Sequence, residues 1–192
     1  MKNSDMTTAA RKRDLRAMTV SRPELLVDGS DLAFRQLIHD IMAFGARMHE
    51  NRARVAGYVG LSGQQYTILI TIAHNQNQDG YGIIQVAEHL RLSGAFVTIE
   101  VNKLVEAGLV RKRPNPIDRR RVLLTILPKA RDMLVGLCRI QRPSNDTIFG
   151  SLSADEFEAL RSIIPRLVEA TDQSLKLIDF LTSDGARISA LR

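Results

Sequence analysis

Residues 108–127, "GLVRKRPNPIDRRRVLLTIL", hold the pattern that decides the fold of this chain. Gly108 is suited to end a helix, and the next five residues, "LVRKR", have the length of a short strand. The segment from Pro114 to Asp118 is rich in turn-forming residues, and an apolar run, "RVLLTIL", follows it. The stretch therefore predicts a two-stranded hairpin with a strongly basic tip.

Two helices are expected directly before this hairpin, in residues 83–110, "IIQVAEHLRLSGAFVTIEVNKLVEAGLV". A short helix precedes a break at "RLS", where Ser93 is placed to cap a second helix. Apolar residues at helical spacing are expected to face inward: Ile84, Val86, Ala87 and Leu90 in the first helix, and Val97, Val101, Leu104, Val105 and Gly108 in the second. Two such helices form a helix-turn-helix, whose second helix is free to enter a DNA major groove. A plain helical hairpin is the alternative.

The preceding part of the chain predicts an arm and two helices. Residues 1–29 are polar and basic without a sustained period, so a mobile arm is expected. A helix then begins with Ser30 or Asp31 as its cap, because apolar residues recur at three- and four-residue steps. A further helix follows a cap at Ser62, with an inner face of Tyr66, Leu69, Ile70 and Ala73. It ends in "HNQNQDGYG", which is typical of a turn.

Helical periodicity resumes after the hairpin in "LPKARDMLVGLCRI", with Pro128 in the first turn. A break is expected around "QRPSNDTIFGSLS", after which Ser153 caps a long helix that is kinked or restarted at Pro165. The apolar stripe of this helix and that of residues 32–48 exceed what the rest of the chain covers. We expect a second subunit to cover these two apolar stripes, and packing within one chain is the alternative.

Composition favours a globular protein that meets a polyanion. The chain has 192 residues, of which 44% are hydrophobic and 25% charged. It holds neither a run of about 18 apolar residues nor the apolar core of a signal peptide, so a cytoplasmic location without membrane contact is expected. The net charge of +6 is concentrated in residues 1–22 and 111–121, each with six basic residues. Such basic segments suggest nucleic acid, although an ordinary solvated surface is the alternative.

Catalysis and metal binding have little sequence support. The single cysteine, Cys138, excludes an intramolecular disulfide and a multi-thiolate metal site. Its apolar neighbours favour a buried structural thiol over a redox sensor. The four histidines are dispersed, and the chain holds no Gly-rich phosphate loop, nucleophile elbow or metal-ligand spacing. We therefore expect no enzymatic activity, no cofactor and no metal.

Three segments together resemble one family: "LSGQQYTIL", "QVAEHLRLSGAFVTIEVNKLVEAGLVRKR" and "NPIDRRRVLLTIL". They are similar to the multiple antibiotic resistance regulator (MarR) family of bacterial transcription factors, most closely over residues 61–131. The resemblance implies a winged-helix dimer in which both chain ends build a dimerisation domain. It also implies a promoter repressor that a small ligand, such as an aromatic acid or its thioester, releases from DNA.

The expected fold is thus mainly α with a small β-wing. Its parts are a basic arm at 1–29, a dimerisation helix at 30–60, a winged helix-turn-helix domain at 61–127, dimerisation helices at 128–183 and a tail at 184–192. The expected function is a ligand-responsive repressor that binds a pseudo-palindromic promoter site in double-stranded DNA as a homodimer. The alternative is a winged-helix module for protein contact without specific DNA binding.

The resemblance also assigns DNA contacts at matching positions. On the recognition helix these are Ser93, Ala95, Phe96, Thr98, Ile99 and Asn102, and on the wing Arg111, Arg113, Asp118, Arg119, Arg120 and Arg121. Arg120 is expected to enter the minor groove, where negative potential is concentrated, with Asp118 orienting the wing. Strand alternation is expected to turn Arg119 and Arg121 to the other side.

Two features of the resemblance leave alternatives. Phe96 and Ile99 are apolar where the family more commonly has polar or basic residues, so they either contact thymine methyl groups or pack inward. The family's effector pocket lies between the dimerisation helices and the winged domain. Its candidates here are Phe34, Ile38, His39, Met42 and Tyr66, each of which has an ordinary core or surface role as the alternative.

Overall fold

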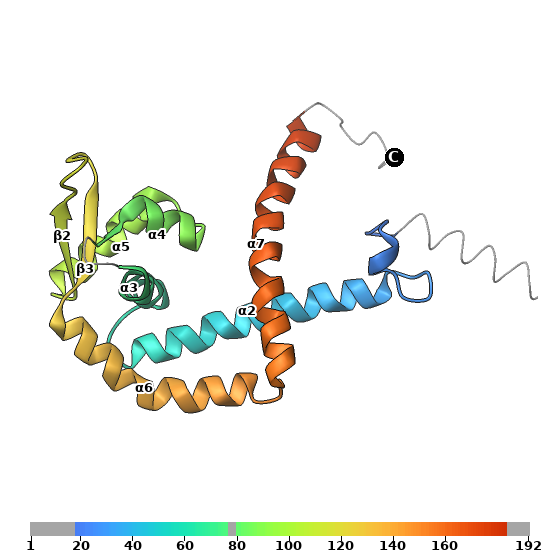
Figure 1. Cartoon of the computed structure of the whole chain (residues 1–192), viewed down its shortest axis with the longest axis horizontal. Helices are drawn as coiled ribbons and strands as arrows, with labels where there is room; N and C mark the ends of the chain where they lie inside the picture. Colours follow the sequence, from blue (N-terminus) through green and yellow to red (C-terminus); the bar gives the residue numbers. More distant parts are fainter. Residues whose placement is uncertain (1–17, 77–79, 184–192) are drawn as a thin grey trace, which may run out of the picture. The chain divides into compact units, whose positions relative to one another are not determined.

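The computed structural model describes residues 18–76 and 80–183, which form mainly helices and one small sheet (Figure 1). This confirms the expectation of a mainly α chain with a small β-wing. The contacts divide the chain into two units, one ending at Leu137 and the other beginning at Cys138. Within the described residues, no helix combines the length and the apolar character of a membrane span.

Asp31 organises the segment that precedes the first long helix, α2 (Leu32–Gly57). Its carboxylate accepts hydrogen bonds from the backbone N–H and the hydroxyl of Thr19, at 2.6 and 2.9 Å, and from Arg35 Nε at 2.9 Å. These bonds, above all the one from the Thr19 N–H, lower the pKa of the Asp31 carboxyl to about 2. The segment also contains the 3-10 helix η1 (Pro23–Leu25). Residues 18–29 therefore differ from the arm expected over 1–29, and residues 1–17 lie outside the described part.

Helix α3 (Gly63–Asn75) begins as predicted at Ser62, in a reciprocal capping box with Gln65. The Gln65 N–H donates to Ser62 Oγ at 3.1 Å, and the Ser62 N–H donates to Gln65 Oε1 at 3.0 Å. The predicted inner face is confirmed at Tyr66 and Leu69, which are fully buried, and wrong at Ile70 and Ala73, which are only half-buried. Ile68 and Ile72 are fully buried beside Leu69, since neighbouring elements cover α3 from several sides.

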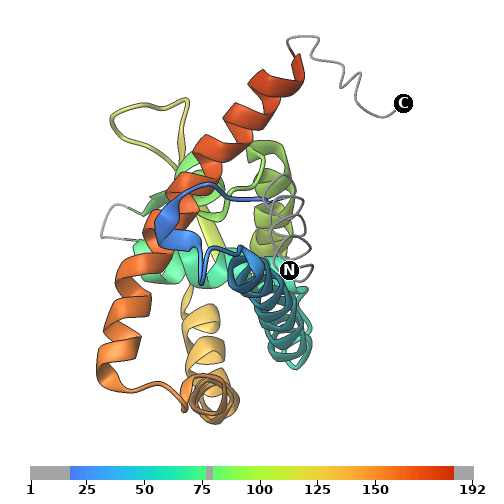
Figure 2. The same ribbon diagram turned by 90° about the vertical axis from the view of Figure 1, so that its right-hand side faces the viewer.

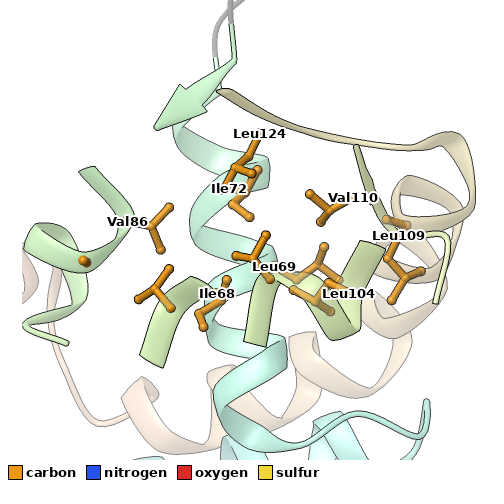
Figure 3. Close-up of a cluster of buried hydrophobic side chains, with 12 residues drawn as sticks. Ile68, Leu69, Ile72, Val86, Leu104, Leu109, Val110 and Leu124 are labelled. Carbon is orange, nitrogen blue, oxygen red and sulfur yellow. The ribbon is translucent and has the colours of Figure 1, made fainter. Parts of the chain in front are cut away.

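The core of the first unit surrounds α3. Figure 3 shows Ile68, Leu69 and Ile72 in its middle, with Val86 of α4 (Ile83–Leu90) on one side. On the other side lie Leu104 of α5 (Gly94–Glu106) and the start of the hairpin. The predicted helix-turn-helix is thus present as α4 and α5, and Ser93 caps α5 as expected. Ile84 was wrongly predicted to face inward and is 55% exposed.

A three-stranded antiparallel sheet with the order β1-β3-β2 completes this unit. The predicted hairpin is formed by β2 (Val110–Pro114) and β3 (Val122–Ile126), with Val110 opposite Ile126 and Pro114 opposite Val122. The third strand, β1 (Tyr81–Gly82), pairs with β3 where only a turn was predicted. Two residues are too few to display the alternation by which a strand is recognised.

Helices α6 (Pro128–Phe149) and α7 (Ala154–Ser183) follow the sheet. Ser153 caps α7 as predicted, because its hydroxyl accepts from the Glu156 N–H at 3.3 Å. The break predicted around residues 141–153 was wrong over most of its length, since α6 continues through Pro143. At Pro165, where a kink or a restart was predicted, α7 continues without a restart. A proline removes one donor, and at an exposed helix surface water satisfies the carbonyl that this leaves.

Cys138 in α6 is exposed, which corrects the prediction of a buried thiol. Its neighbour Leu137 is the residue that faces the core, with 1% exposure. Adjacent helical positions differ by about 100° around the axis, so apolar neighbours in sequence do not ensure burial.

Candidate nucleic-acid interface

One face of α5 is open to solvent. Ala95, Ile99 and Asn102 are exposed on it, and Thr98 is half-buried with its hydroxyl donating to the Gly94 carbonyl at 2.8 Å. Ser93 Oγ accepts from the Phe96 N–H at 3.2 Å, which fixes the first turn of the helix. The two apolar residues behave differently, because Ile99 is 55% exposed and Phe96 is half-buried.

The opposite face of α5 fixes the helix to the core. Val97, Val101 and Leu104 are fully buried, and the buried Glu100 pairs with Lys103 at 2.7 Å. At the end of the helix, Lys129 Nζ donates to the Ala107 carbonyl at 2.8 Å. The exposed face is therefore presented by a firmly anchored element.

Strand β2 separates its three basic side chains between two faces. Lys112 is paired with the buried Leu124, so it lies on the core side of the sheet. There its ammonium donates to Asn102 Oδ1, which joins the wing to the exposed face of α5. Arg111 and Arg113 lie on the other face.

The loop between β2 and β3, residues 115–121, is closed by its own polar groups. Asn115 Oδ1 accepts from the N–H of Ile117 at 2.8 Å and from that of Asp118 at 3.4 Å. The Asp118 carboxylate accepts from the Arg120 N–H at 3.1 Å and pairs with Arg121 Nε at 3.2 Å. The loop projects away from the helices of its unit, as the yellow segment in Figure 2 shows.

This loop corrects the expectation that strand alternation separates the three arginines. Arg119 and Arg120 lie in a turn and Arg121 in a bend, so the two-residue period of a strand does not apply to them. All three are exposed. Asp118 pairs with Arg121, and in the described part of the chain no side-chain partner is found for Arg119 or Arg120.

An open crevice of about 490 Å³ lies where the wing meets the start of α4. Ile83 and Ile84 line one side, and Asn115, Arg120 and Arg121 line the other. Ile84, expected in the core, instead contributes to this crevice. Glu88 of α4 also lines the crevice, so the wing loop and α4 share one surface that combines apolar, cationic and anionic groups.

Comparison with known proteins identifies this arrangement. Residues 59–121, which include α3, α4, α5, β2 and the wing loop, match the model of the MarR family. This segment is therefore similar to the MarR-family domain. No curated protein matches the chain.

Solved structures with the same fold cover most of the chain. The transcriptional regulator BldR from Sulfolobus solfataricus is 23% identical, with 70% of this chain and 96% of that chain covered at a TM-score of 0.59. A mutant MarR from E. coli complexed with operator DNA is 18% identical, with 71% and 94% covered at a TM-score of 0.57. A MarR protein from Peptoclostridium difficile is 17% identical, with 83% and 99% covered at a TM-score of 0.63. These similarities establish the winged-helix fold.

The MarR-type fold does not bring the five predicted effector residues together within one chain. Ile38, His39 and Met42 are exposed on the first half of α2, and Phe34 is half-buried there. Tyr66 is 1% exposed on α3, which begins against Ala53 near the other end of α2. Phe34 and Ala53 are separated by about five helical turns, or roughly 28 Å.

Sequence reasoning missed three residues of the MarR-family wing. Lys112 was overlooked between two arginines, although strand alternation places it on the face toward α5. Asn115 was treated only as part of a turn, although Asn before Pro is a known turn-forming pattern and its side chain closes this loop. Ile117 was not selected, yet it is 95% exposed at the tip of the wing.

Proposed function

We propose that this chain is a cytoplasmic bacterial transcriptional regulator that binds double-stranded DNA through α5 and the wing. The observation that carries this proposal is an exposed cationic loop that is attached to the exposed face of an anchored helix. In a winged helix-turn-helix, such a helix enters the major groove while the wing reaches the adjacent minor groove. We propose that the protein represses a promoter and that a small effector releases it from DNA, as the resemblance to the MarR family implies.

The contacts proposed on α5 combine apolar and polar groups. Ala95 and Ile99 supply apolar surface for thymine methyl groups, and Thr98 and Asn102 supply hydrogen-bonding groups for base edges or phosphates. Phe96, half-buried, supports the helix start more than it contacts DNA. Ser93 is the exposed cap of α5, and we propose that a DNA phosphate binds beside it, where the free N–H groups of the first helical turn favour an anion.

The wing contributes charge in two ways. Arg119 and Arg120 are exposed and free to approach phosphates or enter the minor groove, whereas Arg121 is paired with Asp118. Arg111 and Arg113 lie on the far face of β2 and extend the positive field around the hairpin. Arg120 is the proposed minor-groove residue, since Asp118 fixes its backbone N–H.

We propose that the protein acts as a homodimer. On α2, exposed apolar side chains include Leu37, Ile38, Ile41, Met42 and Phe44. On α7 they include Phe157, Ile164, Leu167, Leu175 and Leu181. Covering such stripes with a second subunit removes large apolar surfaces from water. A two-fold dimer places two recognition helices about 34 Å apart and so favours a pseudo-palindromic site.

The effector site is proposed between subunits. Phe34, Ile38, His39 and Met42 lie along the part of α2 that a partner would cover, and they combine apolar surface with one titratable ring. Tyr66 belongs to the packing of α3 and is a supporting residue rather than a direct contact. An aromatic acid or its thioester is the ligand class that we propose.

The test is DNA binding by the full chain and two charge variants. A duplex is first selected from a random-sequence library with the wild-type protein, and its affinity is then measured over a range of salt concentrations. Arg120→Ala is expected to lose most of the affinity and to lower the slope of log K against log [salt] by about 1 per wing. The control is Arg54→Ala, which removes an exposed arginine of α2 outside the wing.

Two results would count against the proposal. Equal binding by Arg120→Ala and wild type would show that the wing is assigned wrongly. Failure of the wild type to select or retard any duplex at micromolar concentration and physiological salt would favour the alternative, a winged-helix module for protein contact.

A further inference from the structure

The wing tip carries an apolar side chain that no packing within residues 18–76 and 80–183 explains. Ile117 is 95% exposed, more than any other large apolar residue of the described part, where Met42 follows at 70%. Single exposed apolar residues are common on protein surfaces, so exposure alone decides little. The position of Ile117, at the end of a cationic loop, is what calls for an explanation.

The backbone around Ile117 is fixed before any partner binds. Asn115 Oδ1 holds the Ile117 N–H at 2.8 Å, and Pro116 restricts the backbone immediately before it. The loop is closed by the Asn115 N–H donating to the Arg121 carbonyl and by the Arg121 N–H donating to the Asp118 carbonyl, both at 2.9 Å. A partner therefore meets a preorganised loop backbone, which lowers the entropy cost of binding.

The surroundings of Ile117 select the class of partner. Asp118 next to it is occupied by Arg121, and the exposed Arg119 and Arg120 follow. An exposed aliphatic group followed within three residues by two exposed cations matches a DNA groove, whose walls are apolar deoxyribose and whose rims are phosphate. Isoleucine is among the apolar residues that minor-groove proteins insert.

We infer that Ile117 is a specificity-determining residue, which packs into the minor groove beside Arg120 and favours A·T over G·C pairs there. This inference rests on the proposed DNA-binding function. An A·T pair presents only acceptors in the minor groove, and arginine donors satisfy them. A G·C pair adds the guanine N2 amino donor, which neither an isoleucine side chain nor a guanidinium accepts. Burying that donor beneath Ile117 is unfavourable.

The experiment compares Ile117→Ser, Ile117→Leu and Arg120→Ala on the duplex that the wild-type chain selects from a random library. A second duplex replaces the A·T pairs at the wing positions with G·C pairs. Ile117→Ser is expected to bind the selected duplex about tenfold more weakly per wing, because an aliphatic contact is lost. Its salt slope should stay at the wild-type value, whereas Arg120→Ala lowers it.

Discrimination between the two duplexes provides the second readout. Ile117→Ser should discriminate less than wild type, and Ile117→Leu should restore both affinity and discrimination. The control is Val27→Ser, which removes an exposed β-branched side chain outside the wing and should bind as wild type does. Folding of Ile117→Ser should be unchanged, because so little of the side chain is buried.

The outcomes separate this inference from the proposed function. Sequence-selective binding by wild type, together with wild-type affinity and discrimination in Ile117→Ser, would overturn the role of Ile117 alone. A reduced salt slope in Ile117→Ser would also overturn it, since the defect would then lie in the cations. A wild-type chain that selects no duplex would overturn the proposed function, and the inference with it.

Discussion

Alanine substitutions at three glycines can measure two energetic costs of an added Cβ separately. One cost is a strained positive φ, and the other is steric contact with neighbouring atoms. Gly80, beside β1, has φ +93°, and a Cβ built on it lies 2.9 Å from the Leu124 carbonyl oxygen and 3.2 Å from Leu123 Cβ. Gly108, at the end of α5, has φ +69° but nothing within 4 Å of its Cβ. Gly136 in α6 has neither a positive φ nor a close neighbour. Alanine at Gly80 therefore tests backbone strain together with steric contact, and alanine at Gly108 tests backbone strain alone. Alanine at Gly136 introduces neither.

The expected magnitudes follow from these distances. Gly108→Ala should cost about 1–2 kcal/mol, because an L-residue is forced into the left-handed region. Gly80→Ala should cost that amount and a further ~1–3 kcal/mol, since the oxygen it meets belongs to the backbone of β3 and yields only if the strand shifts. Gly136→Ala should stabilise the protein by about 0.5–1 kcal/mol, as alanine does inside a helix.

Urea unfolding followed by far-ultraviolet circular dichroism measures all three variants. The protein concentration must be held constant, because dimerisation would make the midpoint depend on it. Unchanged m-values would show that the variants differ in stability rather than in the surface exposed on unfolding. If Gly80→Ala lost no more stability than Gly108→Ala, the close packing of Gly80 against β3 would be refuted. A loss in Gly136→Ala would refute the argument from open space.

Two further predictions concern Asp31 before α2 and the two faces of α5, all in the same unit. Since hydrogen bonds lower the pKa of the Asp31 carboxyl from 3.8 to about 2, its stabilisation is present above about pH 4 and is lost as the pH falls toward 2. Asp31→Asn should therefore unfold more easily than wild type near neutral pH, and the gap between their midpoints should narrow on acidification; a gap that is independent of pH would contradict this. Leu104→Ala should cost about 2–5 kcal/mol because its side chain is fully buried, whereas Ile99→Ala on the exposed face should change stability by less than about 0.5 kcal/mol. Equal losses in urea unfolding would mean that the two faces of α5 are assigned wrongly.

Local signals in the sequence predicted more of this fold than long-range ones did. Ser62, Ser93 and Ser153 were recognised as helix caps because a cap is formed within four residues of chain. The strand β1 was missed because its pairing with β3 depends on residues about forty positions away. A strand of two residues is too short to show the alternation of apolar and polar residues that would predict such pairing.

Errors about helices came from weighing proline and apolar neighbours without their surroundings. A break was predicted around Pro143 and a kink or restart at Pro165, yet both prolines lie inside continuous helices, where flanking hydrogen bonds outweigh the one that is lost. Ile84 was assigned to the core from helical spacing, and Cys138 from its apolar neighbours, yet both are exposed. The elements that pack against a helix decide which of its residues are buried. Sequence periodicity indicates that an apolar stripe exists but does not predict how much of it is covered.

The wing of the candidate site shows how local chemistry supports a surface function without a core. Three adjacent arginines repel one another, but the loop that carries them is closed by side chains of Asn115 and Asp118 rather than by burial. Pairing of Asp118 with Arg121 offsets one charge and leaves Arg119 and Arg120 facing solvent, where water screens their repulsion. On DNA binding, phosphate groups would replace that water. The loop could keep its conformation, because its own hydrogen bonds already close it. Asn115 acts through the backbone alone and so contributes to the shape of the tip, whereas Arg119 and Arg120 supply its positive charge. Asp118 contributes to both, because it holds the Arg120 N–H and offsets the charge of Arg121.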